Sequence, residues 1–118
     1  MVTSLEQSKH LAELGYSTSR VDMYWHPGYM NVPDQLKRYR YKNVAAYSLG
    51  TLLDSIPQTI LNDEGEEYTF QMGKDDDFTY VFGYDADNNS RIVEFVSEDA
   101  LDAAYEIVCW LLENKYIK

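Results

Sequence analysis

The sequence predicts an α+β domain: a three- to four-stranded antiparallel meander covered by a long C-terminal helix and by shorter N-terminal helices. Residues 68–72 and 78–84 alternate large apolar side chains with polar or smaller ones, and this period of two is typical of strands. Residues 98–113 instead carry an apolar stripe at helical spacing. At 118 residues the chain suits a single domain, 1–118, with a real hydrophobic core.

The first short helix is expected over residues 4–14. Ser4 and Gln7 stand at the spacing of a capping box, in which each side chain bonds the other residue's backbone N–H. Gly15 follows the last apolar residue and suits the left-handed exit of a helix.

Residues 16–47 lose this periodicity. Pro27, Gly28 and Pro33 interrupt the stretch, yet it is dense in aromatic residues, and disordered chains are poor in them. We therefore expect an ordered but irregular arm, with a short helix over 34–41 as an alternative for its second half.

A second short helix is predicted over 48–55, because apolar residues recur at i, i+3, i+4 and i+7 behind Ser48 and stop at Pro57. A weak strand is expected over 58–61 and a further strand over 92–96. Polar turns separate the successive strands, which favours consecutive hairpins.

Ser97 is predicted to cap the final helix, with Glu98 and Asp99 in its first turn, where the helix dipole favours negative charge. Asn114 is the expected exit. Cys109 lies within this helix and is interpreted as a small buried apolar residue. A single cysteine also excludes an intrachain disulfide and any metal site built from several cysteines.

Charge is sorted along the chain. The net charge is −10, and the stretch from Asp54 to Asp102 holds fourteen carboxylates against Lys74 and Arg91. Residues 37–42 hold four cations in six positions, interleaved with tyrosines. Phosphate attraction depends on Lys and Arg, so the acidic balance disfavours direct nucleic-acid binding. We favour pairing of the basic run with the chain's own acidic half or with a second copy.

Aromatic and basic residues of the irregular arm are the candidate partner-binding residues, because Tyr, Trp and Arg are enriched in protein interfaces. Covering the second face of the sheet is an equally simple role for the aromatic members. The candidates are Tyr24, Trp25, Tyr29, Arg38, Tyr39, Arg40 and Tyr41.

Asp85, Asp87 and Asn89 fall on positions 1, 3 and 5 of a calcium-binding loop. The match then fails, because position 6 is Ser90 instead of glycine and position 12 is Val96 instead of a bidentate Glu. Asp and Asn also favour plain turns, so these three residues are only a weak metal candidate.

No motif for catalysis or for a cofactor is present. Glu6, His10 and Glu13 share one predicted helix face, a spacing that also occurs on an ordinary wet helix surface, and His26 lies in the irregular arm. The sequence brings no nucleophile together with a base, so we expect neither an enzyme nor a cofactor. No cationic segment followed by an apolar run opens the chain, and no apolar stretch approaches a membrane span, so we expect a cytoplasmic protein.

The opening residues 4–15 with Asp22-Met23-Tyr24, the segment Tyr47-Ser48-Leu49-Gly50 and the ending 108–117 resemble small uncharacterised proteins carried by prophages and conjugative elements of gut Bacteroidetes. The resemblance rests on helix caps and core stripes. It implies a mobile genetic element and a cytoplasmic setting, and supplies no activity.

Three functional hypotheses follow. The first is a non-catalytic protein-binding or accessory module of a phage or mobile element, whose partner is an unidentified protein or a second copy of the chain. The second is an acidic DNA mimic that inhibits a nucleic-acid-binding host or defence protein through the carboxylates of residues 54–102. The third is a weak calcium-binding domain.

Overall fold

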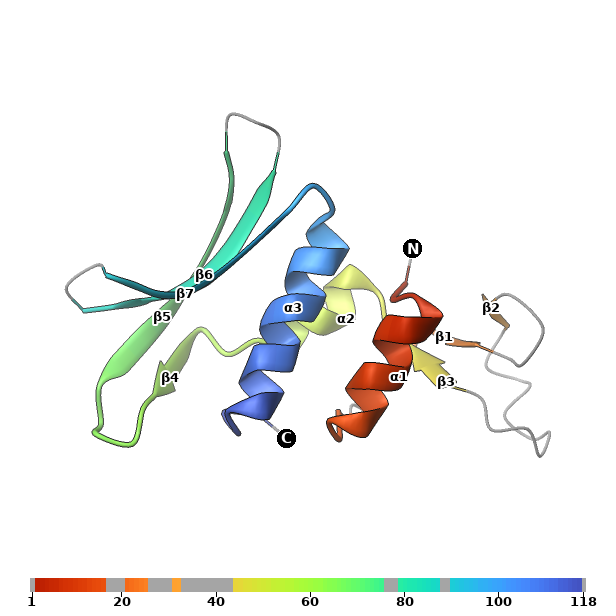
Figure 1. Cartoon of the computed structure of the whole chain (residues 1–118), viewed down its shortest axis with the longest axis horizontal. Helices are drawn as coiled ribbons and strands as arrows, with labels where there is room; N and C mark the ends of the chain where they lie inside the picture. The colour runs from red at the N-terminus through yellow and green to blue at the C-terminus, as the bar shows by residue number, and fades with distance from the viewer. Residues whose placement is uncertain are drawn as a thin grey trace.

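The computed structural model describes residues 2–16, 21–25, 31–32, 44–75, 79–87 and 90–117 (Figure 1). Within these ranges the chain forms three helices and two antiparallel sheets. In chain order the elements are α1 (Leu5–Glu13), β1 (Met23–Trp25), β2 (Asn31–Val32), β3 (Val44–Ala46), α2 (Leu49–Asp54), β4 (Thr59–Leu61), β5 (Glu67–Lys74), β6 (Tyr80–Ala86), β7 (Arg91–Ser97) and α3 (Ala100–Glu113).

The larger sheet is the four-stranded antiparallel meander that the sequence predicts, in the order β4-β5-β6-β7. Its register sets Phe70 opposite Tyr84, and Tyr84 in turn opposite Val93, on one face. A bulge interrupts the pairing of β6 with β7 between Tyr84 and Asp85. The alternating apolar residues thus all reach the same side, which we call the inner face of the sheet.

The helix α3 packs on this inner face, with eight of its residues buried along its length. Tyr84 is fully buried beneath it, with its ring 5.8 Å from that of Trp110 and its hydroxyl donating to the Pro57 carbonyl at 2.7 Å. Asn114 ends the helix, as predicted. The predicted start at Ser97 is wrong by two residues. Ser97 is still paired in β7, so Asp99 caps α3 by accepting from the Leu101 N–H at 2.8 Å.

Both shorter helices lie where the sequence places them. Ser4 and Gln7 form the reciprocal capping box of α1, and Gly15 follows its end with φ of +84°. Ser48 caps α2. Their positions differ from the expectation in one respect: α2 packs on α3, but α1 lies on the side of α3 away from the four-stranded sheet (Figure 1). The helix α1 therefore covers α3 and not the sheet.

The expected irregular arm contains a second, three-stranded antiparallel sheet in the order β2-β1-β3. Tyr24 stands opposite Val32 on one side and opposite Ala45 on the other. These strands have two or three residues each, too few to show a period of two in the sequence. The alternative helix over 34–41 lies outside the described residues.

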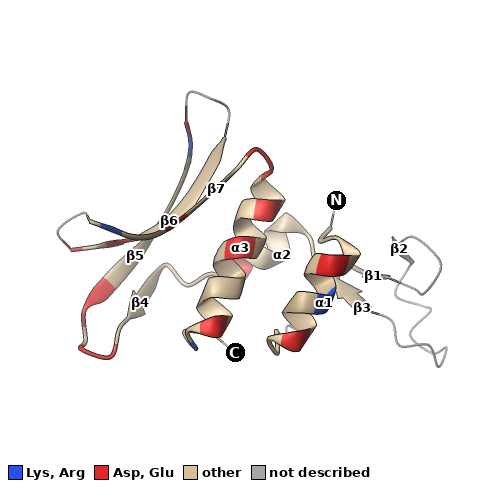
Figure 2. Cartoon of the chain, viewed as in Figure 1, with Lys and Arg blue, Asp and Glu red and all other residues tan. Residues whose placement is uncertain are grey.

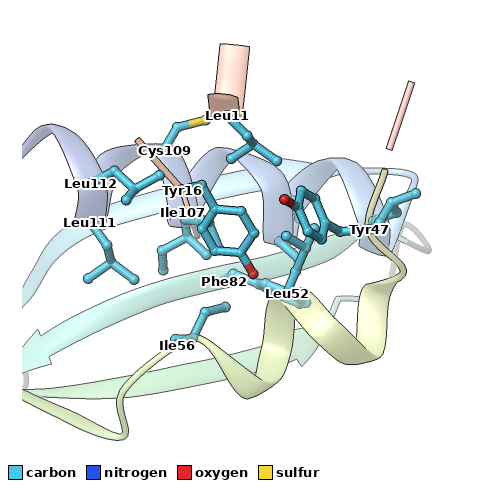
Figure 3. Packing of buried hydrophobic residues seen from close by; sticks show 14 of the residues in the cluster. Leu11, Tyr16, Tyr47, Leu52, Ile56, Phe82, Ile107, Cys109, Leu111 and Leu112 are labelled. Carbon is cyan, nitrogen blue, oxygen red and sulfur yellow. The ribbon is translucent and has the colours of Figure 1, made fainter. Parts of the chain in front are cut away.

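One hydrophobic core joins these parts (Figure 3). Leu11 from α1, Leu52 from α2 and Ile107 from α3 are all fully buried in it. Tyr16 and Tyr47 close its edge with their rings edge to face, 4.7 Å apart, and the Tyr16 hydroxyl lies 2.6 Å from the Ser55 hydroxyl. Among the helices described, none is long and apolar enough to cross a membrane.

Candidate functional site

The predicted partner-binding residues are divided by what the structure describes. Tyr24 and Trp25 lie on β1, the central strand of the small sheet, and the Tyr24 side chain is partly buried. The other five, Tyr29, Arg38, Tyr39, Arg40 and Tyr41, lie outside the described residues, as do His26 and the rest of the basic run.

A hydrogen-bond network that the sequence did not reveal ties the small sheet to α2. The Asp22 carboxylate accepts from the Ser48 backbone N–H at 2.7 Å and from the Thr51 hydroxyl at 2.8 Å. Beside it, the buried Thr3 hydroxyl lies 2.7 Å from that of Ser8 and accepts from the Tyr47 N–H at 3.1 Å. These buried polar groups are satisfied by one another, so their role is to hold the fold together.

Carboxylates predominate among the charged residues of α1 and α3, and Lys9 on α1 is the one Lys or Arg in these two helices (Figure 2). Gln7 donates to the Asp102 carboxylate at 2.7 Å across the two helices. His10 lies 3.9 Å from Glu13 on its own helix and 3.9 Å from Glu113 on α3. Every charged residue within α3 is a carboxylate. Of the predicted Glu6, His10 and Glu13 face, His10 thus lies between Glu13 and Glu113 of α3.

The face of the large sheet that points away from α3, here called the outer face, has no described helix against it (Figure 1). An ion-pair network lies on it: the Arg91 guanidinium pairs with Asp85 and stands 3.8 Å from Glu94. Gly83, directly opposite Glu94 in the register, makes room for the Arg91 side chain to pass. A shallow hollow of about 270 Å³ borders this network over Gln71 and neighbouring residues.

Four exposed large apolar side chains belong to the same sheet, and one of them, Met72, stands opposite Phe82 on its inner face. Leu61 on β4 is 60% exposed, Met72 on β5 is 59% exposed, and Ile92 and Val96 on β7 are 39% and 56% exposed. Among the described residues only Leu5, on α1, is a comparable side chain elsewhere. The sequence indicated the outward position of Val96. Side chains alternate between the two faces of a strand, so Val96 must face away from the side that its apolar neighbour Phe95 faces.

The carboxylates of residues 54–102 do not form a single row. Asp63, Glu64 and Glu66 lie at the turn between β4 and β5, whereas Asp75 follows the opposite end of β5. Asp85 and Glu94 lie on the outer face, and Asp102 lies on α3. Figure 2 shows this division among turns, sheet and helices.

The weak calcium candidate is only partly described. Asp85 is engaged by Arg91, Asp87 is exposed, and Asn89 lies outside the described residues. In the ranges that the structure covers, no three acidic, histidine or cysteine side chains come together as a metal site would require.

Cys109 is buried in α3, as predicted, with 6% exposure. Burial raises the pKa of its thiol to about 11, so at neutral pH it is protonated and a poor nucleophile.

Comparison of the whole chain with protein-family models, curated proteins and solved structures gives no match.

Proposed function

We propose that this chain is a non-catalytic protein-binding module of a phage or other mobile element, and that it binds through its four-stranded sheet. The carrying observation is the exposure of Leu61 and Val96 on the outer face of the sheet, which has no described helix against it, together with exposed Ile92 on β7. Exposed apolar side chains on an uncovered sheet face, with charged residues between them, are a feature of protein interaction sites.

Two further observations support binding over chemistry. The buried polar groups around Thr3 and Asp22 satisfy one another, and the only thiol is protonated and buried. The polar groups of the outer face, Asp85, Arg91 and Glu94, are held in ion pairs, as at the polar rim of an interface.

The test is capture with a surface variant. The protein is cross-linked in lysate of a Bacteroidetes host, and the wild type is compared with a Leu61→Lys, Val96→Lys double variant. Light scattering measures the size of the free protein. We expect the double variant to lose a partner that the wild type retains, since two desolvated lysines oppose an apolar contact.

Leu5→Lys is the matched control, because Leu5 is an exposed apolar side chain on α1, away from the sheet. It is expected to retain the partner. A strictly monomeric wild type that retains no protein would refute the proposal, and so would equal loss in the control.

An acidic DNA mimic remains the second candidate, favoured by one observation. The three charged residues of α3, the partly buried Asp102 and the exposed Glu106 and Glu113, are all carboxylates. The test asks whether the protein displaces labelled DNA from a sequence-nonspecific DNA-binding protein. Fluorescence anisotropy measures the displacement. A Glu106→Lys, Glu113→Lys variant should then lose the displacement, and failure of the wild type to displace DNA would exclude this candidate.

A further inference from the structure

We propose that β7 is the docking edge for an extended segment of a basic partner protein, which adds to the sheet as a fifth strand. This inference rests on the proposed protein-binding function and deepens it, because it names the edge and the chemistry of the segment that pairs with it.

The backbone of β7 provides the first argument. β7 ends the strand order and is hydrogen-bonded to β6 alone among the described strands. The bulge lies near its start, so Val93 to Ser97 continue in regular register with β6. On such an edge strand about half of the N–H and C=O groups point away from the sheet and can pair with an incoming chain. The opposite edge, β4, has only three residues and offers a much shorter ladder.

Side chains on this edge favour strand addition. Val96 is 56% exposed and stands opposite Val81 on the outer face, and Ile92 near the start of β7 is 39% exposed. Apolar residues of an added strand would lie beside these side chains on the same faces and remove them from water. An added strand would therefore gain backbone hydrogen bonds along β7 and apolar contacts with these side chains.

The charges select the partner. Arg91 is already engaged by two carboxylates, Asp85 and Glu94, so this outer-face network keeps an excess of negative charge. Beyond the end of β7 follow the exposed Glu98 and then Asp99. Charges on an edge strand oppose indiscriminate pairing, and here the opposing charge is negative. A strand rich in Lys or Arg is therefore accepted, and an acidic strand is disfavoured.

The probe is a fluorescein-labelled peptide of about nine residues that alternates Lys with Val, long enough to span an edge strand. Its binding is measured by fluorescence anisotropy at low salt and located by amide shifts in nuclear magnetic resonance spectra. Two control peptides carry Glu in place of Lys or N-methyl groups at alternate backbone nitrogens. We expect the Lys peptide to bind, to shift the amides of 93–97, and to outcompete both controls at least tenfold.

Matched variants test the edge and the charge separately. Val96→Lys should weaken the Lys peptide about tenfold, whereas Leu61→Lys, which adds the same charge at similar exposure on β4, should leave its affinity unchanged. Glu94→Gln should weaken it a few-fold, and Glu67→Gln, an exposed carboxylate on β5, should not. All four positions are exposed, and circular dichroism checks that each variant is folded.

Several results would overturn the inference. Equal binding of the N-methylated peptide would exclude backbone pairing, and equal binding of the Glu peptide would exclude charge selection. Amide shifts confined to α1 and α3 would show that the peptide binds the acidic helices instead of β7. A wild-type dimer that Val96→Lys makes monomeric would show that a second copy takes the edge. In each case the proposed protein-binding function still stands if the Leu61→Lys, Val96→Lys double variant loses the partner that the wild type captures.

Discussion

Replacing Gly83 with Ala tests whether the packing of β6 against β7 depends on the absence of a side chain at this position. An added Cβ would collide with the Val93 carbonyl oxygen and lie 2.8 Å from Cδ and 2.9 Å from Nη1 of Arg91. The arginine can swing away, but the carbonyl belongs to the backbone of the neighbouring strand. Relief therefore requires β7 to shift from β6.

The magnitude follows from three contributions. Overpacking costs about 1–3 kcal/mol, and a fixed backbone neighbour favours the upper end. Displacing Arg91 from partly exposed ion pairs with Asp85 and Glu94 adds about 0–1 kcal/mol. Ala restricts the backbone of the unfolded chain more than Gly does, and this stabilises the folded state by about 0.4–1 kcal/mol. We expect Gly83→Ala to lower the free energy of unfolding by about 2 kcal/mol on balance.

The assay is urea unfolding monitored by tryptophan fluorescence. Trp110 reports on this region because it packs against Tyr84, which lies on the same strand as Gly83. The midpoint should fall by about 1–2 M. Gly73→Ala on β5 is the matched control, because a Cβ there meets nothing within 4 Å, and it should be neutral or slightly stabilising. Equal midpoints for the two variants would refute the reasoning.

Three further predictions concern the core. Tyr84→Phe should destabilise the fold by about 1–2 kcal/mol in urea unfolding, because the Pro57 carbonyl loses a buried donor; an unchanged midpoint would contradict this. Asp22→Ala should cost about 1–3 kcal/mol and speed hydrogen exchange at the Ser48 amide, which loses its 2.7 Å acceptor; unchanged exchange would argue against the network. Cys109 should resist alkylation until the protein unfolds, and stability should fall as pH rises above 9 toward 11. The reason is that the folded thiol, with its pKa raised by burial, keeps a proton that the unfolded thiol releases, and the buried Tyr16 acts in the same direction. Rapid native labelling, or unfolding that does not depend on pH in this window, would contradict the last prediction.

Elements set by local rules were predictable from the sequence. The capping box at Ser4, the left-handed exit at Gly15 and the alternation along β5 and β6 each depend on residues a few positions apart, so the sequence reveals them directly. The start of α3 was displaced because Ser97 and Asp99 are both good caps, and pairing of Ser97 with Tyr80 decides between them. That pairing is tertiary and leaves no local signal.

The parts that the sequence did not reveal depend on contacts between distant residues. The small sheet pairs Tyr24 with Ala45, and the Asp22 carboxylate reaches Thr51 across twenty-nine positions. Short strands bury little surface by themselves, so their stability comes from docking on α1 and α2. The candidate edge on β7 was missed for a different reason. Periodicity identifies a strand but does not say which strand ends the sheet.

The width of the apolar stripe on α3 explains why an outer sheet face is left open. Buried residues occupy eight of the fourteen positions of this helix, with Ile107 and Val108 both fully buried, so α3 meets apolar partners on more than one side. The sheet takes one side, and α1 and α2 take others, as Figure 1 shows. All described helices are thereby drawn to the same side of the sheet. The outer face must then be compatible with water, and Gln71, Arg91 and Glu94 meet that demand. Val96 does not, and it is exposed on an edge strand that pairs with β6 alone among the described strands. Compatibility with water does not explain this exposure.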